Sequence, residues 1–168
     1  RLDAAQAAFA DAGAGDPASA LAELVEQLST RLGPGRIRRL AAQDGRLLVV
    51  GLCGAQGSGK STLAARLVDH FNAQGMASAV LSLDDLYLTR AERQALARDV
   101  HPLLVTRGVP GTHDVALGIS VLAALRAGQA TRLPRFDKAR DDRLPESAWS
   151  LVAAGLRLLV FEGWCVGA

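Results

Sequence analysis

The strongest constraint on the fold of this chain is a nine-residue stretch that fits the pattern G-x-x-x-x-G-K-[ST]. An apolar run at residues 46–53 precedes the stretch and predicts a buried strand. Leu63, Leu67 and Phe71 then recur at helical spacing. Gly75 is placed to end that helix. A strand, a glycine-rich loop and a helix in this order predict a nucleotide phosphate site, formed by Gly54, Ala55, Gln56, Gly57, Ser58, Gly59, Lys60, Ser61 and Thr62.

The residue types of this loop explain how it would bind phosphate. Small residues let successive backbone N–H groups surround phosphate oxygens, and the helix N-terminus adds a favourable partial charge. We expect Lys60 to reach the outer phosphates and Ser61 to offer its hydroxyl to Mg²⁺. A flexible Gly/Ser turn would explain the glycines but not the lysine. Only Lys60 and Lys138 of the 19 basic residues are lysines, which favours a role for a compact cation unless Arg-rich coding bias is the cause.

Composition limits the other classes of function. The chain has 168 residues, 49% of them apolar, and a net charge of +2, which fits one globular domain or part of one. No block of like charge indicates a nucleic-acid surface, and no apolar run approaches the ~18 residues of a membrane span. Cys53 and Cys165 border apolar strands, so we expect buried thiols in a reducing cytoplasm rather than a disulfide.

The order of patterns along the chain predicts an α/β protein with a three-layer parallel sheet flanked by helices. Residues 1–45 are expected to form an N-terminal helical extension, and residues 46–168 a P-loop core. Four strands are predicted, at 46–53, 77–83, 131–136 and 156–161, with a charged loop at 137–146. Two further helices are predicted at 89–98 and 114–127. A sheet of only four strands would leave an edge unprotected, so we expect part of the natural protein to lie beyond Ala168.

Charged residues follow the predicted strands, where ligands gather in parallel sheets. Transfer of a phosphoryl group to an alcohol needs a carboxylate that takes the hydroxyl proton, and Asp84 is our candidate for this base. Asp85 could act through Mg²⁺ or simply cap a turn. Glu162 ends an apolar strand, where a second carboxylate could hold the water shell of Mg²⁺. An acidic acceptor would also need cations, for which the sequence offers Arg107, Lys138 and Arg143.

Five motifs in order carry a likeness to a known family. They are the phosphate loop and residues 83–89, 107–114, 134–138 and 161–167. Together they resemble the D-glycerate 3-kinase family, which is related to phosphoribulokinase, uridine kinase and bacterial pantothenate kinase. The likeness covers residues 46–167. It implies a kinase that uses ATP and Mg²⁺ to phosphorylate a hydroxyl of a small molecule, with D-glycerate as the first acceptor to test.

The resemblance also implies roles for individual residues. An Asp of the related kinases acts as the base at the position of Asp84, and Ser61, Asp84 and Glu162 form the expected metal set. The family continues well beyond its Glu-Gly-Trp motif, with further strands, a lid and nucleobase contacts. The acceptor side of the site is expected to include Asp85, Tyr87, Arg107, Thr112, His113, Asp114, Asp137, Lys138 and Arg143.

Three alternatives to a D-glycerate kinase remain at this stage. The chain could phosphorylate another small metabolite, such as uridine, a ribulose phosphate or pantothenate. It could be a regulatory switch of the GTPase type, although no Asn-Lys-x-Asp guanine-reading motif is present. It could also bind nucleotide without catalysis. Thr112 and Asp114 have a simpler interpretation too, as caps of the helix that follows them.

Overall fold

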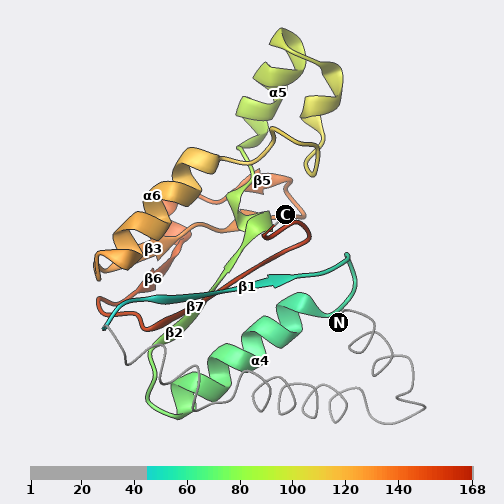
Figure 1. The fold of residues 1–168 in the computed structure, drawn as a ribbon. Coiled ribbons are helices and arrows are strands. Elements are labelled where there is room, and N and C mark those ends of the chain that lie inside the picture. Colours follow the sequence, from blue (N-terminus) through green and yellow to red (C-terminus); the bar gives the residue numbers. More distant parts are fainter. Residues whose placement is uncertain (1–44, 168) are drawn as a thin grey trace, which may run out of the picture.

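A computed structural model describes residues 45–167, so the predicted helical extension at residues 1–45 falls outside the described residues except for Gly45. Its centre is a parallel sheet of three strands, in the order β1-β7-β2 (Figure 1). The strands are β1 (Leu48–Cys53), β2 (Ser78–Ser82) and β7 (Leu158–Gly163). The parallel α/β class predicted from the sequence is therefore confirmed.

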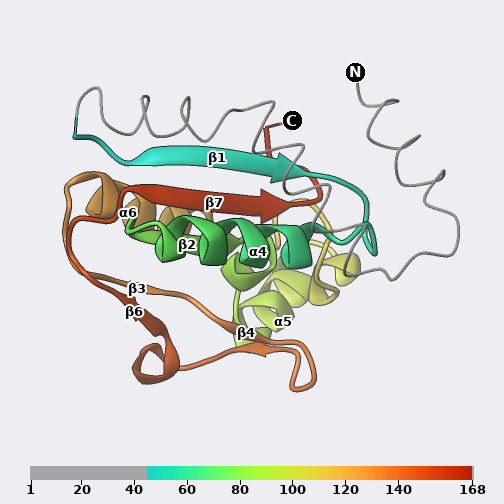
Figure 2. The ribbon, with the colours of Figure 1, turned by 90° about the horizontal axis from the view of Figure 1, so that it is seen from below.

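Helices cover both faces of this sheet. This explains why the sequence of β7 is almost continuously apolar. Leu158 and Val160 pack on α4 (Lys60–Ala73), whereas Leu159 lies in the cluster that holds Val121 and Leu125 of α6 (Val115–Arg126). Figure 2 shows α4 and α6 on opposite sides of the strands. A central parallel strand buried on both faces needs apolar side chains at every position, not at alternate ones.

The predicted helices form close to their expected positions because their ends are marked in the sequence. Gly75 follows α4 with a φ of 77°, a left-handed conformation that favours glycine. Helix α5 (Arg90–Asp99) begins with a capping box in which Thr89 and Glu92 bind each other's backbone N–H groups. The Asp114 carboxylate caps α6 by accepting a hydrogen bond from the N–H of Leu117 at 2.9 Å. Three short 3₁₀ turns lie between these elements and further along the chain: η1 (Leu83–Leu86) after β2, η2 (Pro102–Val105) after α5, and η3 (Glu146–Ala148).

The third predicted strand is not part of the parallel sheet, and the prediction of four parallel strands is wrong for the described residues. Instead, β3 (Thr131–Leu133) pairs antiparallel with β6 (Ser150–Val152), a strand that the sequence did not reveal. The predicted loop at 137–146 contains part of a hairpin of β4 (Phe136–Asp137) and β5 (Asp142–Arg143). Short apolar runs predict extended backbone but not their partner, because pairing depends on distant residues.

Two further predictions concern surfaces. No helix in the described part of the chain is long and apolar enough to cross a membrane. The two cysteines are free thiols, but Cys53 is exposed and Cys165 is half-buried, so the expected burial is wrong. Cys53 is the last residue of an edge strand, where its Sγ donates a hydrogen bond to the carbonyl of Trp164 at 3.2 Å.

Candidate active site

The phosphate loop joins the carboxyl end of β1 to the first turn of α4. Gly57 and Gly59 have φ values of 75° and 82°, which a side chain would strain. Gly59 is the residue before the first turn of α4, so the N-terminus of this helix opens directly onto the loop. The Nζ of Lys60 donates to the carbonyl of Ala55 at 2.8 Å and thus folds back over the loop. This geometry presents backbone N–H groups and one ammonium to the same space.

A cavity of about 260 Å³ opens beside the loop and gathers residues that are far apart in the sequence. Its walls come from the phosphate loop, from η1, from the β4–β5 hairpin and from the end of β7. Four residues of the phosphate loop therefore share one space with three other predicted site residues, Asp84, Lys138 and Glu162. The lining residues are Gln56, Gly57, Lys60, Ser61, Asp84, Lys138, Glu162, Gly163 and Trp164.

A buried carboxylate, that of Glu162, lines this cavity. Glu162 is only 4% exposed, and its Oε1 accepts hydrogen bonds from Ser61 Oγ at 3.1 Å and from Ser82 Oγ at 2.6 Å. Ser82 Oγ also accepts a hydrogen bond from the backbone N–H of Asp84 at 3.3 Å. Sequence reasoning did not single out Ser82, although its position two residues before Asp84 at a strand end was a usable signal.

The oxygen atoms around the cavity fit the requirements of Mg²⁺. This ion prefers oxygen ligands and keeps several waters, so it is commonly held by one or two carboxylates and by substrate phosphates. Ser61, Asp84 and Glu162 supply a hydroxyl and two carboxylates on the walls of the same cavity. Among residues 45–167 no group of three His, Cys, Asp or Glu side chains forms a cage of its own. The donor set therefore suits an ion that arrives with nucleotide.

The adjacent acidic residues Asp84 and Asp85 have different surroundings. Asp84 lines the cavity, and the Nζ of Lys138 donates to its Oδ2 at 2.7 Å. Asp85 is 9% exposed and accepts hydrogen bonds from the N–H of Phe136 at 2.9 Å and from Arg135 at 3.3 Å. Burial raises the pKa of Asp85, even though the Phe136 N–H and the Arg135 guanidinium act in the opposite direction. Asp85 thus ties η1 to the β4–β5 hairpin.

The buried ring of Tyr87 stacks on the half-buried ring of His113. Their ring centroids are 4.4 Å apart, and the Phe136 ring lies edge-on to Tyr87 at 5.5 Å. Burial, assisted by the negative charge of Asp84, raises the pKa of Tyr87 to about 12. Burial also lowers the pKa of His113, and its buried Nε2 has no hydrogen-bond partner among the described residues. Both side chains are therefore neutral near pH 7.

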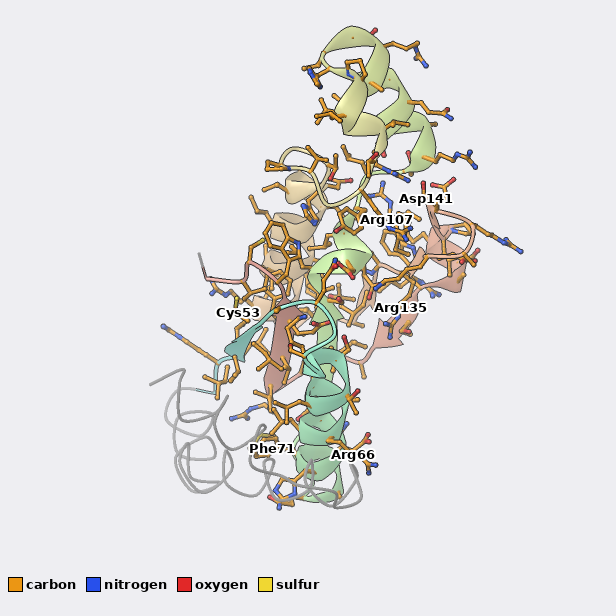
Figure 3. All side chains as sticks on the ribbon, turned by 90° about the vertical axis from the view of Figure 1, so that its right-hand side faces the viewer. Cys53, Arg66, Phe71, Arg107, Arg135 and Asp141 are labelled. Carbon is orange, nitrogen blue, oxygen red and sulfur yellow. The ribbon has the colours of Figure 1, made fainter. Side chains whose placement is uncertain are left out.

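A network of ion pairs holds the hairpin turn that bears Lys138. Arg93 is 1% exposed and donates to the Asp141 carbonyl at 2.6 Å and to its carboxylate at 3.0 Å. Arg107 donates to the same carboxylate at 2.7 Å and to the carbonyl of Lys138 at 3.3 Å. Figure 3 shows Arg107 and Asp141 close together, away from Cys53. Nothing in the sequence distinguishes Arg93 from the other arginines, so its burial was not predicted.

Other predicted acceptor residues are engaged in contacts around the cavity instead of lining it. Arg143 pairs with Asp114 at 2.7 Å, and the hydroxyl of the fully buried Thr112 donates to the Val109 carbonyl at 2.6 Å. Burial alone would raise the pKa of Asp114, but the Leu117 N–H and Arg143 outweigh it and lower that pKa.

Asp137 belongs to the same group, since its Oδ1 accepts two backbone N–H bonds from Ala139 and Arg140. These bonds shape the turn between β4 and β5. Of the three cations predicted for an acidic acceptor, Lys138 is the one that lines the cavity.

Comparison with known proteins identifies similar kinases. A sequence model described as the phosphoribulokinase / uridine kinase family matches residues 49–166. The chain is 40% identical over 131 residues to the chloroplastic D-glycerate 3-kinase of Arabidopsis thaliana, covering 71% of this chain and 28% of the relative. It is 39% identical over 133 residues to a Schizosaccharomyces pombe protein named as an uncharacterized kinase, covering 74% and 48%. The chain thus spans less than half the length of either relative.

A solved structure shows the same arrangement of elements. The D-glycerate 3-kinase from Cryptococcus neoformans superposes with a TM-score of 0.67 and 31% sequence identity. The superposition covers 84% of this chain and 52% of that one.

Proposed function

Because the chain belongs to the phosphoribulokinase / uridine kinase family of P-loop kinases, we propose that it transfers the terminal phosphoryl group of ATP to a hydroxyl of a small acceptor, with D-glycerate as the first candidate. The observation that supports this proposal most directly is the single cavity shared by Lys60, Ser61, Asp84 and Lys138. A phosphate-binding lysine and a carboxylate that line the same cavity suit a donor and an acceptor that meet inside it.

On the donor side, the loop N–H groups and the N-terminus of α4 bind the phosphates, and Lys60 neutralises their charge as it moves off the Ala55 carbonyl. Ser61, Asp84 and Glu162 would hold Mg²⁺ or its waters. When bound, Mg²⁺ neutralises the charge that develops on the phosphate oxygens.

On the acceptor side, Asp84 accepts the proton of the attacking hydroxyl. The acceptor oxygen forms a bond to the terminal phosphorus, the bond between that phosphorus and the bridging oxygen breaks, and ADP leaves. Asp84 suits this role better than Asp85, because Asp84 lines the cavity while both oxygens of Asp85 are bound by Phe136 and Arg135.

An acidic acceptor fits this arrangement through Lys138. Its side chain is 63% exposed and pairs with Asp84, so a carboxylate of the acceptor can take over that ammonium as its hydroxyl approaches Asp84. Arg107 and Arg143 act at longer range, since both are paired with carboxylates outside the cavity. The names of two relatives support D-glycerate among the acidic hydroxy compounds.

A coupled assay of ADP release tests the proposal on the purified protein. Hydroxy acids, nucleosides, ribulose phosphate and pantothenate are offered one at a time with ATP and Mg²⁺. We expect D-glycerate to stimulate ADP release well above the rate without acceptor. Stimulation by a nucleoside alone would redirect the proposal to another member of the family, and absence of stimulation by every compound would contradict a kinase activity.

The cellular location remains a prediction. The free thiols of Cys53 and Cys165 suit a reducing compartment such as the cytoplasm. The plant relative is named as chloroplastic, so other compartments also house proteins of this kind.

A further inference from the structure

Ser82 forms hydrogen bonds with two parts of the cavity wall, the Glu162 carboxylate and the backbone N–H of Asp84. It is the last residue of β2 and lies opposite Glu162 in the register between β2 and β7. Side chains at paired positions of neighbouring strands lie on the same face of a sheet. The Ser82 hydroxyl is therefore directed toward the Glu162 carboxylate at the edge where the cavity opens.

The hydroxyl of Ser82 makes two contacts at once. Its single proton is donated to Glu162 Oε1 at 2.6 Å, while its oxygen accepts the backbone N–H of Asp84 at 3.3 Å. A serine hydroxyl offers one donor and two acceptor sites, so both contacts are possible together. Ser61 donates to the same Glu162 oxygen at 3.1 Å, so two hydroxyl groups bind that oxygen.

We propose that Ser82 is a positioning residue that fixes the Glu162 carboxylate and the start of η1 relative to each other, and so sets the distance between the Glu162 and Asp84 carboxylates. The inference rests on the proposed function, because it assigns Glu162 to Mg²⁺ and Asp84 to the acceptor hydroxyl. Groups that bind a metal-ligating carboxylate orient it and tune its affinity for the metal. The buried Glu162 depends on such partners, since it is only 4% exposed.

Three variants separate this role from general support of the sheet. Ser82→Ala removes both hydrogen bonds, whereas Ser82→Thr keeps a hydroxyl and suits a strand. Ser78→Ala is the matched control in the same strand, because the Ser78 hydroxyl donates to the Met76 carbonyl at 2.7 Å, at the end of β2 away from the cavity. Thermal unfolding of all variants shows whether each is folded.

The first measurement does not depend on catalysis. Titration calorimetry gives the affinity for ATP with Mg²⁺ and for ATP with a chelator, and their ratio is the gain due to the metal. We expect Ser82→Ala to reduce this gain roughly tenfold while leaving the affinity for metal-free ATP near that of the unmodified protein. Ser82→Thr should restore most of the gain, and Ser78→Ala should leave it unchanged.

The second measurement is the Mg²⁺ dependence of kcat with the best acceptor. We expect Ser82→Ala to need roughly ten times more Mg²⁺ for half-maximal kcat. The proposal is overturned if Ser82→Ala keeps the full metal-dependent gain, if Ser82→Thr behaves like Ser82→Ala, or if the unmodified protein shows no gain. A protein that shows the gain but phosphorylates no acceptor would disprove the proposed kinase function and leave the role of Ser82 in metal binding supported.

Discussion

The two sides of the cavity are built in opposite ways. The donor side comes from one contiguous loop, whose shape depends on the left-handed glycines Gly57 and Gly59 and on the start of one helix. The acceptor side comes from η1, the β4–β5 hairpin and α5, joined by ion pairs such as that between Arg93 and Asp141. The donor side is therefore specified locally, while the acceptor side is specified by contacts between distant residues, such as Lys138 and Asp84, which are 54 positions apart.

This difference separates two kinds of charged residue. Lys60 is held by one backbone carbonyl and is available to a ligand. Arg107 was predicted to bind an acidic acceptor. Its guanidinium instead donates to the Asp141 carboxylate and to the Lys138 carbonyl of the β4–β5 hairpin. Substitutions on the donor side should therefore change ligand binding directly, whereas many substitutions on the acceptor side should first change stability.

The largest effect is expected at the residue where the two sides meet. Asp84→Asn keeps the shape of the side chain but removes the base, so we expect kcat to fall roughly a thousandfold with little change in the affinity for ATP. Steady-state kinetics and calorimetry measure the two quantities. Asp99→Asn, at the end of α5 away from the cavity, is the control. An Asp84→Asn variant with near-normal kcat would move the base role to another group.

The next effect concerns the ion pairs of the acceptor side. Arg93→Met should lower the free energy of unfolding by about 3 kcal/mol, because Asp141 and the carbonyls of Leu88 and Val105 lose a buried partner. Urea denaturation measures the change. Arg98→Met, at an exposed position of the same helix, should stay within about 0.5 kcal/mol of the unmodified protein. Equal effects of the two variants would contradict a specific role of Arg93.

The two lysines offer a direct comparison of the two sides. Lys60→Ala should weaken binding of ATP roughly 10- to 100-fold, since it removes a charge-assisted contact with phosphate. Lys138→Ala should leave the affinity for ATP unchanged and raise the KM for an acidic acceptor by a similar factor. Calorimetry and acceptor kinetics on both variants measure these constants. If Lys138→Ala weakens ATP binding as much as Lys60→Ala does, the division into two sides is wrong.

The smallest effect is a titration. Tyr87 is the only tyrosine of the chain, so the ultraviolet absorbance of ionised tyrosine after a rapid pH jump reports it alone. We expect a midpoint near pH 12, because burial and Asp84 oppose ionisation. The neutral ring favours the folded state, so the stabilisation is complete below pH 10 and is lost as the pH rises through 12. Asp84→Asn should lower the midpoint, and an unchanged midpoint would place Tyr87 away from Asp84.

The sequence predicted those parts of the molecule that short segments determine by themselves. The strand, loop and helix around Gly59 and the helix cap at Asp114 depend on residues within a few positions. The partner of β3 was not predictable, because a three-residue run with one buried leucine, Leu133, fits a parallel or an antiparallel neighbour equally well.

The candidate site divides in the same way. The sequence identified the cavity residues Lys60, Ser61, Asp84, Lys138 and Glu162. It did not identify the residues that hold these side chains in place. No periodic or compositional pattern predicts that Arg93 is buried, or that Ser82 binds both Glu162 and the N–H of Asp84.

We propose that an acceptor binds between the two sides of this cavity, with its hydroxyl at Asp84 and its acidic group at Lys138. A crystal structure with Mg²⁺, a non-hydrolysable ATP analogue and D-glycerate tests it most directly. We expect triphosphate density along residues 54–62, and an acceptor hydroxyl about 2.6–3.2 Å from the Asp84 carboxylate. Acceptor density away from Asp84, or an acceptor carboxylate bound by Arg107 or Arg143 in place of Lys138, would contradict it.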